Sequence, residues 1–254
     1  FTMMSYTSPA GFLSNSGYNA VTPMTYDIAV LQELYGTPSY SGYDGDTKHA
    51  IISSKTYSTI YETSGNDTIS AETADTGWSM RLSNSNTSEK RSEAIGASEV
   101  PSAQVIMTMG SIENAIGSQY QDIIYGSSGS NVISAGDGND LIVGYGGVDT
   151  IDGGAGSDRL YFTQDVSSLT VSYQSLDILS FYDGSTNLGT ATNFESFVFG
   201  LWTDNYYGLS FEELESYITD TAATVTTNIT GTVKAVSYTH LRAHETPEHL
   251  VCRL

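Results

Sequence analysis

The sequence predicts a mainly β fold in which short strands stack on tight turns. Gly, Ser, Thr, Asn and Tyr are abundant, a composition that suits turns and strands better than helices. Short strand-like segments separated by loops run from about residue 38 to 116 and again from 163 to 220. Between them, residues 117–161 repeat with a period of nine. Such a repeat indicates stacked units that share one core.

The charge balance limits the classes of partner that the chain is expected to bind. Twenty-nine acidic and nine basic residues give the 254-residue chain a net charge of −20. This excess argues against binding nucleic acid or an anionic membrane surface and favours metal cations. No apolar run approaches the roughly 18 residues that a membrane span needs. The sequence begins with FTMMSYTSP, which resembles the interior of a longer sequence, so we expect a fragment whose N-terminal part lies upstream.

The repeat consists of five consecutive nines: GSQYQDIIY, GSSGSNVIS, AGDGNDLIV, GYGGVDTID and GGAGSDRLY. The first position is glycine in four of the five copies, and so is the fourth. The sixth position is Asp122, Asn131, Asp140, Asp149 and Asp158. The eighth is always aliphatic: Ile124, Ile133, Ile142, Ile151 and Leu160. Four matched columns without a gap make this the most specific signal in the chain.

Each nine combines a turn with a brief strand. Its glycine-rich half turns sharply because glycine tolerates positive φ, and its second half points one aliphatic side chain inward. Two nines make one coil, so turns from nines n and n+2 face each other along one edge. Without a cation the facing carboxylates repel, so metal binding and folding should be coupled.

The facing turns offer only oxygen donors, which Ca²⁺ prefers. We therefore pair Asp122 with Asp140, Asn131 with Asp149, and Asp140 with Asp158, and expect the Asn131 site to be the weakest. Carbonyls at the first and third positions would complete the sites: Gly117, Gln119, Gly126, Ser128, Ala135, Asp137, Gly144, Gly146, Gly153 and Ala155. The alternative, an ordinary surface-turn Asp at each position, suits one isolated copy better than five in register.

The nines resemble the repeat-in-toxin (RTX) pattern G-G-x-G-x-D-x-aliphatic-x. The resemblance implies a right-handed parallel β-roll that binds several calcium ions. It also implies export from a Gram-negative bacterium by type I secretion machinery. The chain would stay unfolded in the calcium-poor cytosol and fold outside the cell, in millimolar calcium.

A helix is predicted upstream, over TPMTYDIAVLQELYG, residues 22–36. Thr22 suits the N-cap, Pro23 the first helical position and Gly36 the position after the last turn. Its apolar residues recur at helical spacing: Met24, Ile28, Leu31 and Tyr35. This stripe should pack on a partner that lies largely upstream.

FTMMSYTS followed by this helix resembles the end of the catalytic domain of serralysin-type metalloproteases, which are metzincins. The resemblance implies that Met4 is the Met-turn methionine beneath the zinc site. It makes Tyr6 the tyrosine that ligates zinc or stabilises the transition-state oxyanion. A buried methionine and an ordinary packed tyrosine are the simpler alternatives.

Two further loops resemble the calcium loops of the same family. YDGDT and ETSGNDT would hold one ion through Tyr43, Gly45, Thr47, Glu62, Ser64 and Asp67. The SIENAIG segment places Glu113 nine residues before Asp122, in the sixth column of the repeat. With Gly65 and Asp67, Glu113 would complete a second calcium site.

The family's zinc motif, H-E-x-x-H-x-x-G-x-x-H, is absent from these 254 residues. The resemblance therefore implies a zinc endopeptidase acting on proteins or peptides only in the intact parent, and an inactive fragment here. A non-catalytic RTX adhesin or surface module is the alternative, and a lipase with the same repeats is a weaker one.

We expect the chain to divide into six parts. They are the end of a metzincin catalytic domain with its last helix (1–37), a β-strand region with calcium loops (38–116), the nonapeptide roll (117–162), a β-rich cap (163–220), a linker or truncated continuation (221–235) and a sequencing artefact (236–254). A capping box of Ser210 and Glu213 predicts a short helix in the cap.

Residues 240–252, HLRAHETPEHLVC, look at first like a metal site. His240 and His244 are four apart, which puts two imidazoles on one helical face. Back-translated, however, VSYTHLRAHE resembles a transposase-type sequencing adapter and HLVCRL a flow-cell primer. We therefore expect adapter read-through over 236–254. Without it the chain holds one histidine, His49, and no cysteine, which leaves no zinc site.

Overall fold

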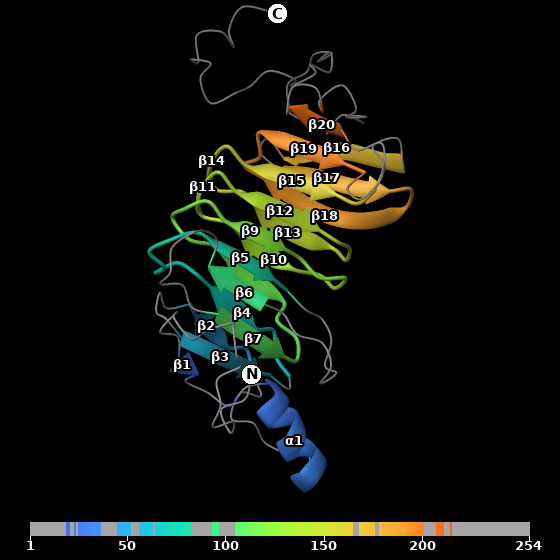
Figure 1. Ribbon diagram of the computed structural model, residues 1–254. Coiled ribbons are helices and arrows are strands. Elements are labelled where there is room, and N and C mark those ends of the chain that lie inside the picture. Colours follow the sequence, from blue (N-terminus) through green and yellow to red (C-terminus); the bar gives the residue numbers. More distant parts are fainter. Residues whose placement is uncertain are drawn as a thin grey trace, which may run out of the picture.

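The computed structural model describes residues 19–20, 23, 25–36, 45–51, 56–62, 64–82, 93–96, 105–164, 168–175, 178–200, 207–210 and 214. These residues form an elongated stack of strands (Figure 1). The helix α1 (Thr25–Tyr35) lies at one end of the stack, and β16 (Leu169–Ser175) to β20 (Tyr207–Ser210) lie at the other. The prediction of a mainly β fold is confirmed.

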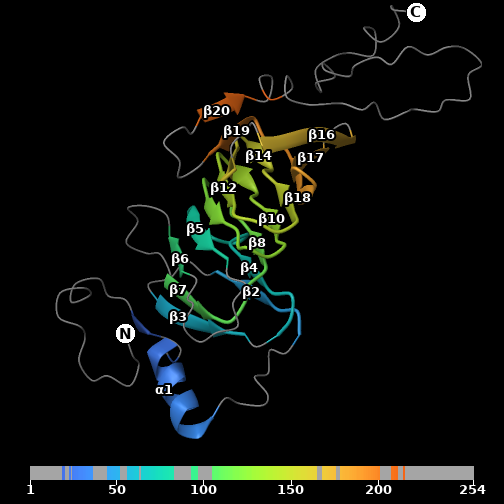
Figure 2. The ribbon, with the colours of Figure 1, turned by 90° about the vertical axis from the view of Figure 1, so that its right-hand side faces the viewer.

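Most strands belong to two long sheets, which lie side by side in Figure 2. The first sheet has the order β1 (Asn19–Ala20), β3 (Thr56–Tyr61), β7 (Val105–Met109), β6 (Glu93–Gly96), β5 (Trp78–Arg81), β9 (Ile123–Tyr125), β12 (Leu141–Gly144), β15 (Arg159–Phe162), β19 (Ser196–Phe199) and β20. The second has the order β16, β17 (Ile178–Asp183), β18 (Thr186–Thr192), β13 (Asp149–Asp152), β10 (Val132–Ser134), β8 (Asn114–Ile116), β4 (Thr68–Ser70) and β2 (Lys48–Ala50).

Strands from the nines alternate between the two sheets along the chain, so two nines make one coil, as the repeat predicted. Neighbouring coils pair in parallel, with partners 18 residues apart, such as Ile124 with Ile142 and Ile133 with Ile151. At the turn edge, β11 (Asp137–Gly138) and β14 (Ala155–Gly156) form a third, two-stranded parallel sheet. The stack is not parallel throughout: β6 pairs antiparallel with β5 and β7, β17 with β16 and β18, and β20 with β19.

The eighth-column side chains form the core. On the first sheet the inward ladder is Met80, Ile124, Ile142, Leu160 and Phe197. On the second it is Ile69, Ala115, Ile133, Ile151 and Ala191. All ten are at most 5% exposed and belong to one hydrophobic cluster. Burial of an aliphatic side chain contributes about 1.5–3 kcal/mol, so these ladders supply the main apolar stabilisation. Both ladders continue beyond the nines at each end.

The helix predicted over residues 22–36 is confirmed from Thr25 to Tyr35. Gly36 ends it with a φ of +82°, and its N–H donates to the carbonyl of Gln32 at 2.8 Å. This is the left-handed stop that glycine adopts without a Cβ penalty. The Nε2 of Gln32 donates to the hydroxyl of Tyr61 at 2.8 Å, which ties the helix to β3.

Several predictions fall outside the described residues: Met4, Tyr6, Tyr43, the helix predicted after Ser210 apart from Leu214, and the segments 221–235 and 236–254. Both sheets draw strands from the 38–116, 117–162 and 163–220 segments, and the division into those segments stays a prediction. No helix in the described part of the chain is long and apolar enough to cross a membrane.

Candidate calcium sites at the turns

Acidic side chains and one asparagine line up in two rows where the turns enter the strands. The first row precedes strands of the first sheet and consists of Asp122, Asp140, Asp158 and Glu195. The second row precedes strands of the second sheet and consists of Asp67, Glu113, Asn131 and Asp149. Parallel pairing in register brings each member beside the next, although their spacing in sequence varies.

In the first row, each carboxylate accepts a hydrogen bond from the backbone of the preceding coil. Oδ1 of Asp140 accepts from the N–H of Asp122 at 2.7 Å, and Oδ1 of Asp158 accepts from the N–H of Asp140 at 2.7 Å. Two contacts extend the row: Asp122 accepts from the N–H of Trp78, and Glu195 from the N–H of Asp158, both at 2.6 Å. The structure therefore brings together both predicted pairs, Asp122 with Asp140 and Asp140 with Asp158.

In the second row, Oδ1 of Asp149 accepts from the N–H of Asn131 at 2.9 Å, which brings the third predicted pair together. Asn131 is satisfied by protein groups. Its Oδ1 accepts from the N–H of Ser127 at 2.7 Å, and its Nδ2 donates to the carbonyl of Glu113 at 2.7 Å. Further along, Glu113 Oε2 accepts from the N–H of Asp67 at 2.7 Å.

Most side chains of the two rows are buried, whereas Glu113 is half-buried and Glu195 is exposed. The sixth-column side chains of the five nines and Asp67 are each at most 5% exposed. Desolvation raises the pKa of Asp140 and of Asp149 to about 7 and that of Asp158 to about 6. The charge of Glu195 adds to the upward shift at Asp158. Burial likewise raises the pKa values of Asp122, Asp67 and Glu113. A buried carboxylate needs a compensating partner, and a cation at the turn would supply one.

Two oxygens of the first row have no such partner. Oδ2 of Asp140 and Oδ2 of Asp158 are buried and accept no hydrogen bond in the described structure. By contrast, Oδ2 of Asp122 accepts from the N–H and hydroxyl of Ser118. Oxygen atoms left bare of hydrogen bonds are what a hard cation such as Ca²⁺ takes as ligands. The residues of the first row therefore fit calcium.

The turn glycines allow neighbouring coils to pack closely beside these oxygens. A Cβ at Gly153 would lie 3.1 Å from Oδ2 of Asp158 and 2.2 Å from the carbonyl oxygen of Asn193. A Cβ at Gly117 would lie 2.7 Å from Oδ2 of Asp122 and 1.9 Å from the carbonyl oxygen of Ala135. First-column glycine thus lets a carboxylate and a carbonyl oxygen approach the same turn closely, where any side chain would clash with the carbonyl.

The predicted carbonyl ligands divide into two groups. The first-position residues Gly117, Gly126, Ala135 and Gly153 are buried, and Gly144 is half-buried. The third-position residues lie at the turn tips: Gln119, Ser128, Asp137 and Ala155 are exposed and Gly146 is half-buried. Among the described residues, no three His, Cys, Asp or Glu side chains gather as a metal cluster. Each site would draw on two sixth-column side chains and several backbone carbonyls instead.

Three residues of the predicted loop site lie close together, and calcium binding there stays a prediction. Asp67 Oδ1 accepts from the N–H of Thr47 at 2.8 Å, and the Thr47 hydroxyl donates to the Gly45 carbonyl at 3.0 Å. A Cβ at Gly65 would lie 2.7 Å from that carbonyl oxygen and 3.0 Å from Oδ1 of Asp67.

Glu62 contacts His49. Its Oε1 is 2.5 Å from Nε2 of His49, and burial lowers the pKa of that ring. Ser64 is exposed beside Gly65. Calcium ligation by Glu62 and Ser64 stays a prediction.

Sequence reasoning missed Glu195. The residues Glu195, Ser196 and Phe197 repeat the acid-x-apolar order of Asp158, Arg159 and Leu160, and they occupy the same register one coil further on. That order was visible in the sequence. The regular spacing of the repeat did not reveal Glu195, because Glu195 follows Asp158 by 37 residues instead of 18.

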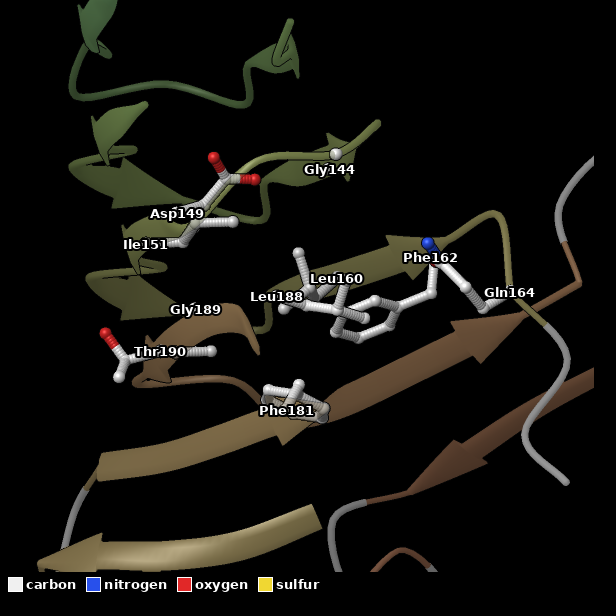
Figure 3. A pocket seen from close by; sticks show the side chains of 12 residues that line it. Gly144, Asp149, Ile151, Leu160, Phe162, Gln164, Phe181, Leu188, Gly189 and Thr190 are labelled. Atoms are coloured by element: carbon white, nitrogen blue, oxygen red, sulfur yellow. The ribbon is translucent and has the colours of Figure 1, made fainter. Parts of the chain in front are cut away.

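The second row ends differently. Its next register position after Asp149 is Gly189, where a Cβ would lie 2.0 Å from the carbonyl oxygen of Asp149. Beside it lies a hollow that is lined mainly by apolar side chains. Figure 3 shows Asp149 and Gly144 on one side of this hollow and Leu160, Phe162, Leu188 and Phe181 further in. No acidic residue continues the row there.

The described geometry is that of a calcium-binding repeat module. The family described as RTX calcium-binding nonapeptide repeat (4 copies) matches residues 116–148 and 125–160. A search of the curated proteins gives no match. The chain thus contains RTX calcium-binding nonapeptide repeats, which are typical of secreted extracellular bacterial proteins.

Proposed function

We propose that this chain is a calcium-dependent folding module, which forms its β stack when calcium occupies the turns. One observation carries the proposal. Asp122, Asp140 and Asp158 lie in register on successive coils, fully buried, with unpartnered oxygens on the last two. A cation bound between coils would satisfy those oxygens and join one coil to the next.

The electrostatics support the coupling of binding to folding. At neutral pH a metal-free stack must either bury ionised carboxylates or keep them protonated, and both options cost free energy that the unfolded chain avoids. The net charge of −20 adds general repulsion to the compact state. Calcium that binds only the folded chain stabilises it by mass action, by about 2.7 kcal/mol per site at a hundredfold excess over Kd.

Circular dichroism tests this function. The far-UV spectrum of the whole chain should change from coil to β when calcium replaces a chelator. The midpoint should fall near 10⁻⁴–10⁻³ M, on the order expected of extracellular calcium modules. Magnesium at the same concentration should have little effect, because it requires a tighter octahedral site and gives up water reluctantly. An identical β spectrum in chelator and in calcium would overturn the proposal.

We further propose that the module belongs to a secreted zinc-dependent endopeptidase, exported by type I machinery from a Gram-negative bacterium. The support is the resemblance of FTMMSYTS and residues 22–36 to the end of a serralysin-type catalytic domain. Apolar side chains on α1 add to it: Leu34 is 67% exposed and Tyr35 82%. A helix that belongs to a larger domain would bury such side chains. In the parent, Met4 would lie beneath the zinc and Tyr6 would assist catalysis.

The rival is a non-catalytic RTX adhesin or surface module, which would share the calcium-dependent stack. The DNA upstream of the Phe1 codon separates the two. An open reading frame encoding H-E-x-x-H some tens of codons earlier supports the protease, and an intact frame without it leaves the rival. Amplifying the same locus from source DNA also tests 236–254, since read-through predicts that this tail is absent from the genome.

A further inference from the structure

We propose that Glu195 and Asp158, with the carbonyl oxygen of Asn193, hold a calcium ion that closes the first row beyond the last nine. This site rests on the proposed calcium-dependent folding and adds a ligand from outside the repeat. It would join the strand β19 to the last coil of the nines.

The register places Glu195 where a sixth-column aspartate would stand. After β15 the chain adds the antiparallel strands β16 and β17 and then β18, which pairs with β13 in the second sheet, before Ser196 pairs with Arg159. Glu195 then repeats the contact of the row, its Oε2 accepting from the N–H of Asp158 at 2.6 Å. The corresponding distances at Asp140 and Asp158 are both 2.7 Å.

The length of the turn explains why this residue is glutamate. Between β13 and β15 the turn has six residues, from Gly153 to Asp158. Between β18 and β19 it has three, from Asn193 to Glu195. A shorter turn holds its backbone in a different place, and the extra methylene of glutamate lets the carboxylate reach the same N–H. The four-residue turn between β7 and β8 carries a glutamate at its sixth-column position as well, Glu113.

Asp158 supplies the independent sign of a ligand. The residue is 0% exposed, and its two oxygens face different neighbours. Oδ1 accepts from Asp140 N–H in the preceding coil, whereas Oδ2 has no hydrogen bond. Oδ2 and the carbonyl oxygen of Asn193 both approach Gly153 closely, at 3.1 and 2.2 Å from where a Cβ would stand, so the two oxygens lie beside the same glycine.

The backbone conformation and a side-chain hydrogen bond of Asn193 fix the position of that carbonyl. It adopts a φ of +57°, the only positive value of a non-glycine residue among those described. Its Nδ2 donates to Oδ1 of Asp152 at 2.7 Å, which holds the short turn against the end of β13. A carboxylate pair and a carbonyl give oxygen donors only, and waters at the exposed Glu195 side would complete the six or more ligands that Ca²⁺ takes.

The test is the number of calcium ions bound by the whole chain, measured by equilibrium dialysis and calorimetry. Glu195→Gln keeps an oxygen that accepts from Asp158 N–H but removes the charge, so the variant should fold in calcium and bind one ion fewer. Glu195→Asp, too short for the three-residue turn, should also lose that ion. Glu33→Gln, on the exposed face of α1, is the matched control and should bind as many as the unaltered chain.

Equal calcium numbers for the unaltered chain and Glu195→Gln would overturn this site while leaving the proposed function standing. If the unaltered chain binds no calcium, the proposed function itself fails. If Glu195→Gln binds one ion fewer and its melting temperature in chelator is unchanged, the result supports a ligand role for Glu195 over a purely structural one.

Discussion

The two acidic rows share one geometry but differ in charge. In the first row, three aspartates follow one another and a glutamate closes the end. In the second row, Asn131 interrupts the carboxylates and Gly189 ends them. The amide of Asn131 forms hydrogen bonds with Ser127 and Glu113. Asp140 and Asp158, by contrast, each have one buried oxygen that accepts no hydrogen bond. The comparison shows that a protein amide satisfies the turn at Asn131, and we propose that a cation satisfies the charged turns at Asp140 and Asp158.

The largest effect should come from Asp140→Asn, because Asp140 borders two proposed sites of the first row. The amide oxygen still accepts from Asp122 N–H, so the variant loses charge but keeps the hydrogen bond. Loss of two sites at saturating calcium should cost about 5 kcal/mol, or about 10–20 °C in Tm. Thermal melts in calcium and in chelator measure this.

Asp149→Asn, in the second row, should cost about half as much because it borders one proposed site. Asp183→Asn in the β17 hairpin, outside both rows, serves as the control. If Asp140→Asn and Asp149→Asn have equal effects, the two rows do not differ as described.

The pH should act in opposite directions with and without calcium. The pKa values of Asp140 and Asp158, about 7 and 6, are raised above their ordinary value near 3.8. Between about pH 4 and 7 the folded chain therefore holds protons that the unfolded chain has released. The metal-free stack should be most stable at the acid end of this window and lose stability as pH rises to 7.

Calcium must displace those protons, so its affinity should rise over the same interval. Melts in chelator from pH 5 to 8 and calcium titrations at pH 5.5 and 7.5 check both signs. A metal-free stability that increases with pH would contradict the burial of ionisable carboxyl groups in the rows.

Asn131→Asp should make the second row resemble the first. With calcium, the site between the introduced carboxylate and Asp149 should bind about tenfold more tightly, since the ligand set gains a charge. Without calcium, the variant should lose about 1–3 kcal/mol, because a buried carboxylate replaces a satisfied amide. Calcium titration and chelator melts of the same sample separate the two effects, and an unchanged affinity would show that charge does not set the difference.

The smallest effect concerns the core, where the rows do not differ. Ile142→Val on the first sheet and Ile133→Val on the second remove one methylene each from equally buried ladders. Both should cost about 1 kcal/mol and leave the number of bound calcium ions unchanged. Denaturant unfolding in calcium measures the pair, and a change in calcium number for either one would mean that core and turns are not separable.

Much of the repeat could be predicted, because each nine contains both its turn and its strand. The period therefore gave the inward aliphatics, such as Ile142, and the carboxylates of the turns, such as Asp140, without any knowledge of distant pairing. The helix at Thr25–Tyr35 was equally local, since its final glycine and helical spacing lie within a dozen residues. Hydrophobic and acidic columns at a fixed spacing determine the coil because neighbouring units are identical in register.

The ends of the rows were decided only by the tertiary structure. Trp78 meets Asp122 across 44 residues and Glu195 meets Asp158 across 37, and neither interval fits the period. The alignment of these residues depends on the three antiparallel strands β16–β18 and on where β5 joins the first sheet. Sequence alone determined which residues line the turns and the core within a coil, because those contacts repeat. Which residues close the stack was set by long-range strand pairing, whose register is fixed by the packing of the entire sheet.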